Sequence, residues 1–272
     1  MHWNSELILW TAGVALHILL LAVLFACGRI RRFPLFTLLI FFYVLRSLTL
    51  YVTFSKISRT AYTGMRLDMA LADVLLETLV LLSLGWMGLK DAGYKPRFAI
   101  PGVIVGLAVA ASLPIFWGKW PPLLWPGSPD FNWTMLGSIL ANKGNIFVQA
   151  LAIVVALAVL ISSRHTGLRW TSHVRRLLQG FSAYAVVSIV VILVLQHMEA
   201  TMKLTTMEEY QAALAKLRTI SYLPTATYFL AVIYWIVTLW RDEKTVLPAE
   251  PIEAVALPEE LPPLTTPETP AE

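Results

Sequence analysis

The sequence predicts an all-α fold: a polytopic membrane protein built as a bundle of seven transmembrane helices, with the N-terminus outside and the C-terminus in the cytoplasm. Of the 272 residues, 57% are hydrophobic and only 14% are charged, whereas a soluble domain carries about 25% charged residues. The apolar residues gather in runs of about 20, the length that crosses the hydrocarbon core of a bilayer as a helix. Seven such runs occur, at residues 7–27, 34–54, 69–89, 98–117, 140–162, 177–197 and 220–240.

The first three runs are separated by short polar segments. No Lys or Arg precedes the run at 7–27, so it lacks the basic region of a signal peptide and is expected to stay as an uncleaved first helix. The basic stretch 28–32 (GRIRR) follows it, and Pro34 then opens the second run, where proline fits the first turn of a helix. Asp68 precedes the third run, and a carboxylate there would complement the helix N-terminus.

The last four runs are divided partly by longer segments on the predicted outer side. The segment 117–133 is rich in Trp and Pro, and its Trp side chains suit the headgroup region of a bilayer. Residues 206–218 begin with a capping box (TMEE) and continue with apolar residues at helical spacing, which predicts a short amphipathic helix on the outer surface. The seventh run follows, with Pro224 in its first turn.

The transmembrane domain is predicted to cover residues 1–244, and the remaining segment differs from it in composition. Residues 245–272 contain seven prolines and six glutamates, with no Lys, Arg or aromatic residue. Such a segment cannot bury enough apolar surface to offset its ordering entropy. We therefore expect residues 245–272 to form a disordered cytoplasmic tail.

The distribution of basic residues gives the predicted orientation. With the N-terminus outside, the inner segments 28–33, 90–97, 163–176 and 241–244 hold twelve Lys and Arg residues, against eight in the outer segments. Lys and Arg are enriched in cytoplasmic loops, so this count favours the orientation stated above. We expect an integral, multi-pass protein of the plasma membrane, specifically a bacterial inner membrane.

Three ionisable residues, Arg46, Asp73 and Glu77, fall well inside the predicted spans. An ionised side chain at mid-helix costs at least about 2.5–3.5 kcal/mol, so such residues usually face the bundle and find partners. Asp73 and Glu77 share one helical face, and Arg46 lies at a comparable depth one helix earlier. One Arg between two carboxylates leaves one formal negative charge, or one shared proton. The cluster is either an ion-pair staple within the bundle or part of a functional site.

Further polar residues accompany this cluster at membrane depth. Asn142, Asn145 and Gln149 form a stripe that runs inward from the outer end of the fifth span, which suits a cavity open to the outside better than helix packing alone. His17 lies near mid-depth in the first span, and Tyr234 lies on a polar face of the seventh. The candidate ligand- or ion-binding residues are therefore Arg46, Asp73, Glu77, Asn145, Gln149, His17 and Tyr234.

No cofactor, metal or catalytic residue is predicted. Retinal is disfavoured because residues 220–240 contain no lysine for a Schiff base, and a bis-histidine haem is disfavoured because His17 and His197 lie at different depths. The single cysteine, Cys27, leaves no basis for a metal site of several thiolates. The motifs of metalloproteases, serine hydrolases and P-loop enzymes are absent from the sequence, so we do not expect an enzyme.

The expected partners are the lipid bilayer and a membrane or cytoplasmic protein that contacts the inner loops or the tail. Nucleic acid is not expected, because no basic stripe with interleaved aromatic residues lies outside the spans. Three functions remain open: a receptor or sensor with an outward-facing polar pocket for a small ligand, a small-solute or proton-linked transporter that uses Arg46, Asp73 and Glu77, and a structural or accessory subunit of a membrane complex. The missing inverted repeats weigh against a transporter, and the polar stripe favours the receptor.

Overall fold

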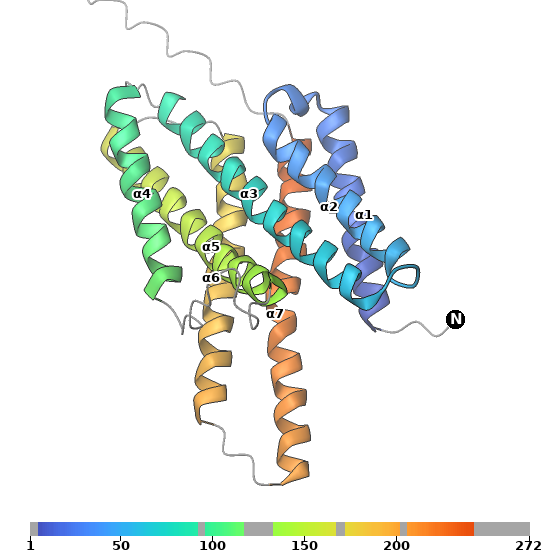
Figure 1. Ribbon diagram of the computed structural model, residues 1–272. Helices are drawn as coiled ribbons and strands as arrows, with labels where there is room; N and C mark the ends of the chain where they lie inside the picture. Colours follow the sequence, from blue (N-terminus) through green and yellow to red (C-terminus); the bar gives the residue numbers. More distant parts are fainter. Residues whose placement is uncertain (1–4, 92–95, 117–132, 167–171, 202–205, 242–272) are drawn as a thin grey trace, which may run out of the picture. The chain divides into compact units, whose positions relative to one another are not determined.

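The structure is a computed structural model that describes residues 5–91, 96–116, 133–166, 172–201 and 206–241. Within these ranges the chain is helical and contains no strand. The elements are α1 (Ser5–Ala26), the short 3-10 helix η1 (Arg29–Arg31), α2 (Pro34–Thr53), α3 (Arg59–Asp91), α4 (Pro96–Phe116), α5 (Trp133–Thr166), α6 (Ser172–Thr201) and α7 (Met207–Trp240). Each of the seven α-helices overlaps one of the seven apolar runs of the sequence (Figure 1).

Five of these helices, α1, α2, α5, α6 and α7, are long and apolar enough to cross a membrane. A bilayer accommodates such helices because every backbone polar group is bonded within the helix. In α4 the apolar stretch Ile100–Phe116 is shorter, and α3 interrupts its apolar residues with the carboxylates Asp68, Asp73 and Glu77. The five apolar helices fit an integral membrane protein, as the sequence predicts.

Six of the helices form a closed ring of contacts. Going round the ring, α1 packs against α2, α2 against α3, α3 against α5, α5 against α6, α6 against α7, and α7 returns to α1. The fourth helix lies outside this ring, where it packs mainly on α5 and touches α3. Sequence neighbours therefore pair in space except at one point, where α5 takes the place of α4 beside α3.

An apolar core fills one part of this ring. Its largest fully buried side chains are Trp235, Phe33, Phe36, Leu20, Leu24, Leu39, Ile40, Leu81, Leu84, Leu151, Leu177 and Leu178. The rings of Phe36, Phe181 and Trp235, from three different helices, have centroids 4.7 to 6.1 Å apart. The indole of Trp235 also donates a hydrogen bond of 3.3 Å to the Leu177 carbonyl, and Gly180 leaves it room, since a methyl group there would overlap the indole.

Two predicted helix boundaries are wrong. The third helix begins at Arg59, so Asp68 is an exposed residue within the helix instead of its start. Residues 206–218 do not form a separate surface helix, because they are the beginning of α7, and Pro224 lies inside that helix. The predicted capping box is present at Thr206, and the Ala, Leu, Lys and Arg residues after it favour continued helix. Buried or membrane-embedded helices tolerate an internal proline when neighbouring groups satisfy the backbone.

The predicted tail, residues 245–272, lies outside the described residues, as do the Trp- and Pro-rich segment 117–132 and residues 92–95 and 167–171 of the inner segments.

Candidate functional site

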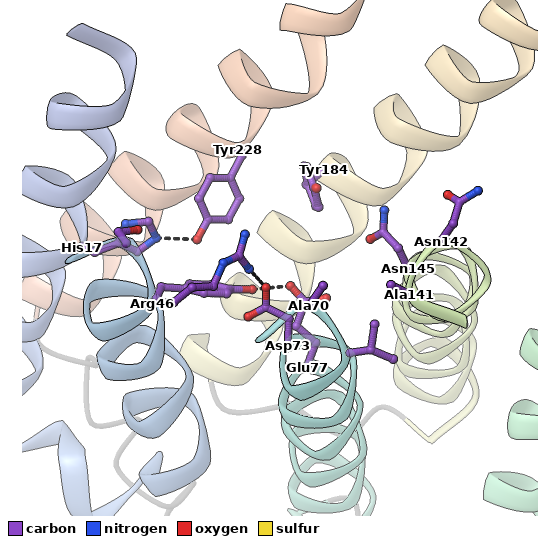
Figure 2. Close-up of a pocket in the computed structure, with 13 residues that line it drawn as sticks. His17, Arg46, Ala70, Asp73, Glu77, Ala141, Asn142, Asn145, Tyr184 and Tyr228 are labelled. Atoms are coloured by element: carbon purple, nitrogen blue, oxygen red, sulfur yellow. Dashed lines mark hydrogen bonds and ion pairs between the residues drawn. The ribbon is translucent and has the colours of Figure 1, made fainter. Parts of the chain in front are cut away.

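A cavity of about 430 Å³ lies within the helix ring (Figure 2). It is lined by His17, Tyr43, Arg46, Ser47, Ala70, Asp73, Val74, Glu77, Ala141, Asn142, Asn145, Tyr184 and Tyr228. These residues come from all six ring helices, while α4 contributes none. In α1, α3, α5 and α7 the lining residues precede the largest fully buried side chains of the core, and in α2 and α6 they follow them. Because helix directions alternate, the cavity lies on one side of the apolar core.

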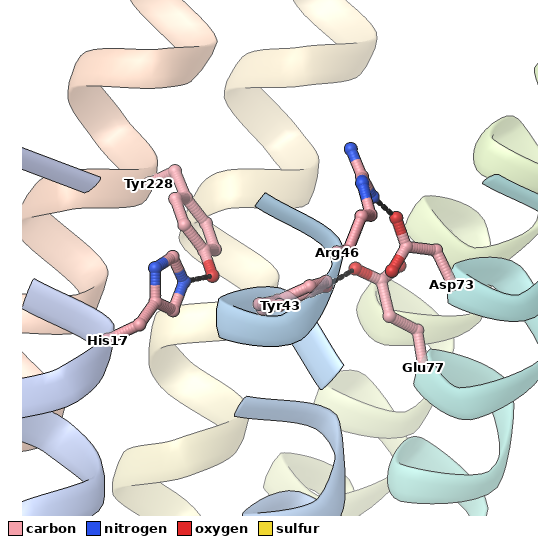
Figure 3. Close-up of polar contacts among 6 residues, drawn as sticks. All are labelled: His17, Tyr43, Arg46, Asp73, Glu77 and Tyr228. Carbon is pink, nitrogen blue, oxygen red and sulfur yellow. Dashed lines mark hydrogen bonds and ion pairs between the residues drawn. The ribbon is translucent and has the colours of Figure 1, made fainter. Parts of the chain in front are cut away.

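Arg46 and Asp73 form an ion pair across the interface between α2 and α3 (Figure 3). Their side chains are 35% and 14% exposed, so the pair is partly shielded. This pairing agrees with the sequence prediction, because a charge placed in a span needs a partner. The second carboxylate oxygen of Asp73, Oδ1, is buried and has no hydrogen-bond partner among the described residues.

Glu77 lies one helical turn after Asp73 and faces the same cavity. Its Oε1 accepts a hydrogen bond from the hydroxyl of Tyr43 in α2, as Figure 3 shows. Among the residues that the structure describes, Glu77 makes no salt bridge. Counting formal charges, the cavity wall therefore carries one cation, Arg46, and two carboxylates.

His17 lines the cavity from α1, with its ring beside those of Tyr43 and Tyr228, and both of its ring nitrogens are engaged. Nδ1 lies 2.6 Å from the carbonyl oxygen of Gly13, and Nε2 lies 2.6 Å from the hydroxyl oxygen of Tyr228. A carbonyl oxygen only accepts hydrogen bonds, so Nδ1 carries the proton. In a neutral imidazole Nε2 then accepts, and Tyr228 donates to it. The side chain of His17 is 8% exposed and has the paired environment expected of a buried polar group.

The predicted amide stripe enters the cavity only in part. Asn142 and Asn145 line it from α5. Gln149, one turn further along, is 3% exposed and lies outside the lining, and its Nε2 donates to Asn145 Oδ1 over 3.3 Å. Its own Oε1 is buried and has no hydrogen-bond partner within the described ranges. Gln149 thus supports the cavity wall through Asn145.

Tyr234 lies away from the other candidates. It is 37% exposed, and its hydroxyl donates a hydrogen bond of 2.9 Å to Gln179 of α6. It does not line the cavity. Five of the seven sequence candidates line this one cavity: Arg46, Asp73, Glu77, His17 and Asn145.

Three tyrosines, Tyr43, Tyr184 and Tyr228, line the cavity without having been proposed as site residues. The ring of Tyr228 lies between the other two, with centroids 6.2 Å from Tyr43 and 5.5 Å from Tyr184, at interplanar angles of 84° and 66°. The helical periodicity of α7 indicates that Tyr228 faces the bundle, because it lies on the same stripe of the helix as the buried Trp235.

A second cavity adjoins the first. It has a volume of about 840 Å³ and is lined by Trp10, Arg46, Ser47, Leu50, Tyr51, Val52, Phe54, Ser55, Lys56 and Tyr62. Arg46 and Ser47 line both cavities, and the rings of Trp10 and Tyr51 stack at 4.6 Å on its border.

Within the described residues, no group of three or more His, Cys, Asp or Glu side chains is placed to hold a metal ion. Comparisons with protein-family profiles, curated proteins and solved structures found no match for this chain.

Proposed function

We propose that this protein is a membrane receptor or sensor that binds a small ligand in the polar cavity of the helix ring. One observation carries the proposal: six helices each contribute lining residues to a single space of about 430 Å³. Binding pockets for small ligands typically measure about 300–1,000 Å³ and combine apolar walls with a few convergent polar groups. The cavity has both, because Ala70, Val74 and the tyrosine rings alternate with charged and amide side chains.

A purely structural role for the polar cluster leaves two observations unexplained. In an ion-pair staple, the buried polar groups should satisfy one another and the helices should close on them. Here the Asp73 Oδ1 atom is buried without a partner in the described part of the chain, and the space beside it is large enough for a ligand. The orientation with the N-terminus outside would open this cavity to the exterior, which suits a receptor.

The test is a cavity-filling substitution combined with a ligand screen. The purified protein in detergent micelles is screened against a small-molecule library by thermal unfolding, since a ligand at a hundred times its Kd stabilises the folded state by about 2.7 kcal/mol. Ala70→Phe in α3 and Ala141→Phe in α5 each place a ring in the cavity from a different wall. The matched control is Ala226→Phe, at an exposed position of α7.

Hits that stabilise the wild type and the Ala226→Phe variant, but neither cavity variant, support binding in the cavity. Support requires that both cavity variants lose stabilisation by the hit compounds, so that misfolding of a single variant does not decide the outcome. Hits that stabilise all four proteins equally, or a complete lack of hits, would contradict the proposal.

A further inference from the structure

The charges that line the cavity leave one carboxylate without a cation. Arg46 is engaged by Asp73, and Glu77 makes no salt bridge within the described residues. His17 supplies no counter-charge as the neutral imidazole described above, and both of its ring nitrogens are already hydrogen-bonded, to Gly13 and Tyr228. With Arg46, Asp73 and Glu77 in their ordinary ionised forms, the lining has a formal charge of −1. A carboxylate kept away from bulk water is stabilised by a cation placed against it.

The hydroxyl protons of Tyr43 and Tyr228 are already used. Tyr43 donates its proton to Glu77, and Tyr228 donates its proton to His17, as derived above from the bond between Nδ1 and the Gly13 carbonyl. Each hydroxyl oxygen can still accept a hydrogen bond but has no proton left to give. Together with the carboxylate oxygens of Glu77, this wall of the cavity presents hydrogen-bond acceptors.

The aromatic rings on the same wall are suited to a cation. Tyr43, Tyr184 and Tyr228 line the cavity from α2, α6 and α7, and Tyr228 stands at steep angles to both of its neighbours. Rings set at such angles present π faces and edges to a shared space, and a cation within about 6 Å of a π face is attracted by the ring quadrupole. The attraction is larger where the cation is removed from water.

We propose that the ligand of this cavity is a small organic cation with N–H donors, a protonated primary or secondary amine. Its ammonium group binds Glu77 and the acceptor oxygens of Tyr43 and Tyr228, among the three tyrosine rings. This inference rests on the proposed function, since it names the class of ligand for the same cavity. A carboxylate or phosphate ligand fits this wall less well, because it would meet Glu77 and two hydroxyl groups that have no free proton.

The experiment compares ligands that share a skeleton and differ in charge. Binding to the purified full-length protein is measured by titration calorimetry and thermal unfolding for two sets: propylammonium, 1-propanol and propionate, and phenethylammonium, 2-phenylethanol and phenylacetate. We expect each ammonium compound to bind about thirty-fold more tightly than its alcohol, the factor that corresponds to a desolvated cation–π contact of about 2 kcal/mol. The carboxylates should bind more weakly than the alcohols.

Two substitutions separate the charge from the rings. Glu77→Gln keeps the size of the side chain and an oxygen for the Tyr43 hydroxyl, and should remove at least tenfold of the preference for ammonium over alcohol. Its matched control is Asp68→Asn, which removes a carboxylate from an exposed position on the same helix. Tyr184→Leu removes a π face from the cavity wall and should weaken ammonium binding about fivefold. Tyr234→Leu is the control for loss of a tyrosine outside the cavity.

The outcomes separate this inference from the proposed function. If the alcohols or carboxylates bind as tightly as the ammonium compounds, and filling the cavity abolishes that binding, the inference fails while the binding role of the cavity stands. If Glu77→Gln folds and retains the full ammonium preference, the inference fails as well. If no member of either set, and no compound of the wider library, binds in the cavity, both proposals fail.

Discussion

The ion pair between Arg46 and Asp73 should contribute measurably to the stability of the helix ring. The perturbation is a double-mutant cycle made of Arg46→Met, Asp73→Asn and the double variant. Two opposite charges within about 4 Å attract by about 4 kcal/mol at an effective dielectric constant of 20. Holding the long arginine side chain in one geometry costs up to about 2 kcal/mol in lost rotamer entropy. The expected coupling energy is therefore about 2 kcal/mol.

The single substitution Arg46→Met should cost more than this coupling energy suggests, because it leaves the carboxylate of Asp73 without its cation. Breaking a fully buried pair costs about 3–5 kcal/mol. Since Arg46 is 35% exposed and Asp73 14%, we expect about 3 kcal/mol, the lower end of that range. The double variant removes the stranded charge of Asp73 and should be less destabilised than the sum of the single variants.

The assay is reversible unfolding of the purified protein in mixed micelles, followed by far-UV circular dichroism at increasing denaturing detergent. A control cycle pairs Arg66→Met with Asp68→Asn, an arginine and an aspartate that are both exposed on α3 and two residues apart, where side chains do not face each other. Its coupling energy should be close to zero. A coupling below about 0.5 kcal/mol for Arg46 and Asp73, which is the level of exposed pairs, would refute the reasoning. So would a stability of Arg46→Met equal to that of the wild type.

Three other predictions concern the remainder of the helix ring. Gly180→Ala should destabilise the protein by about 1–3 kcal/mol in the same unfolding assay, because the added methyl meets the buried Trp235 ring; wild-type stability would show that the indole can move aside. Cys27, the single cysteine, should react in intact cells with a membrane-permeant maleimide and not with an impermeant one, because the predicted orientation places it at the cytoplasmic end of α1. Labelling by both reagents would show that the orientation is the opposite of the predicted one. Thr206→Ala should remove the N-cap of α7 and lower the stability of the helix start by about 1 kcal/mol, which hydrogen exchange would detect as faster amide exchange in the first turn of α7. Unchanged exchange would show that the cap contributes little.

The helices and the charged pair were predictable because the membrane constrains them strongly. A helix of about 20 apolar residues is the main way for a chain to cross hydrocarbon, so seven apolar runs predict seven helices. A charged residue within such a run needs a partner at its own depth. Arg46 had Asp73 and Glu77 as the candidates on the next helix, and the structure forms the pair with Asp73.

The aromatic side of the cavity could not be predicted in the same way. Tyrosine has an apolar body and a polar tip, so it occurs in cores, in cavities and at membrane interfaces alike. In α7, apolar residues occur on every side of the helix, and hydropathy therefore does not reveal which stripe faces the bundle. The prediction chose the stripe with Tyr234, whereas the buried stripe contains Trp235 and turns Tyr228 toward the cavity.

The helix boundaries were missed for a related reason. A prediction that starts from apolar runs ends a helix where polar residues begin, as it did at Asp68 and before residue 220. Hydrogen bonding within the backbone continues through polar residues when nothing interrupts it, so α3 and α7 are 33 and 34 residues long.

The mutual contacts of the rings of Phe36, Phe181 and Trp235 affect how readily a solute in the cavity could pass further through the bundle. They belong to α2, α6 and α7, the helices that also carry Tyr43, Tyr184 and Tyr228, and along each helix they lie on the apolar-core side of the tyrosine. Passage of a solute through the bundle along this direction would require these buried rings to separate. In the proposed binding role, occupancy of the cavity would then follow the ligand concentration on the side of the membrane from which the ligand enters.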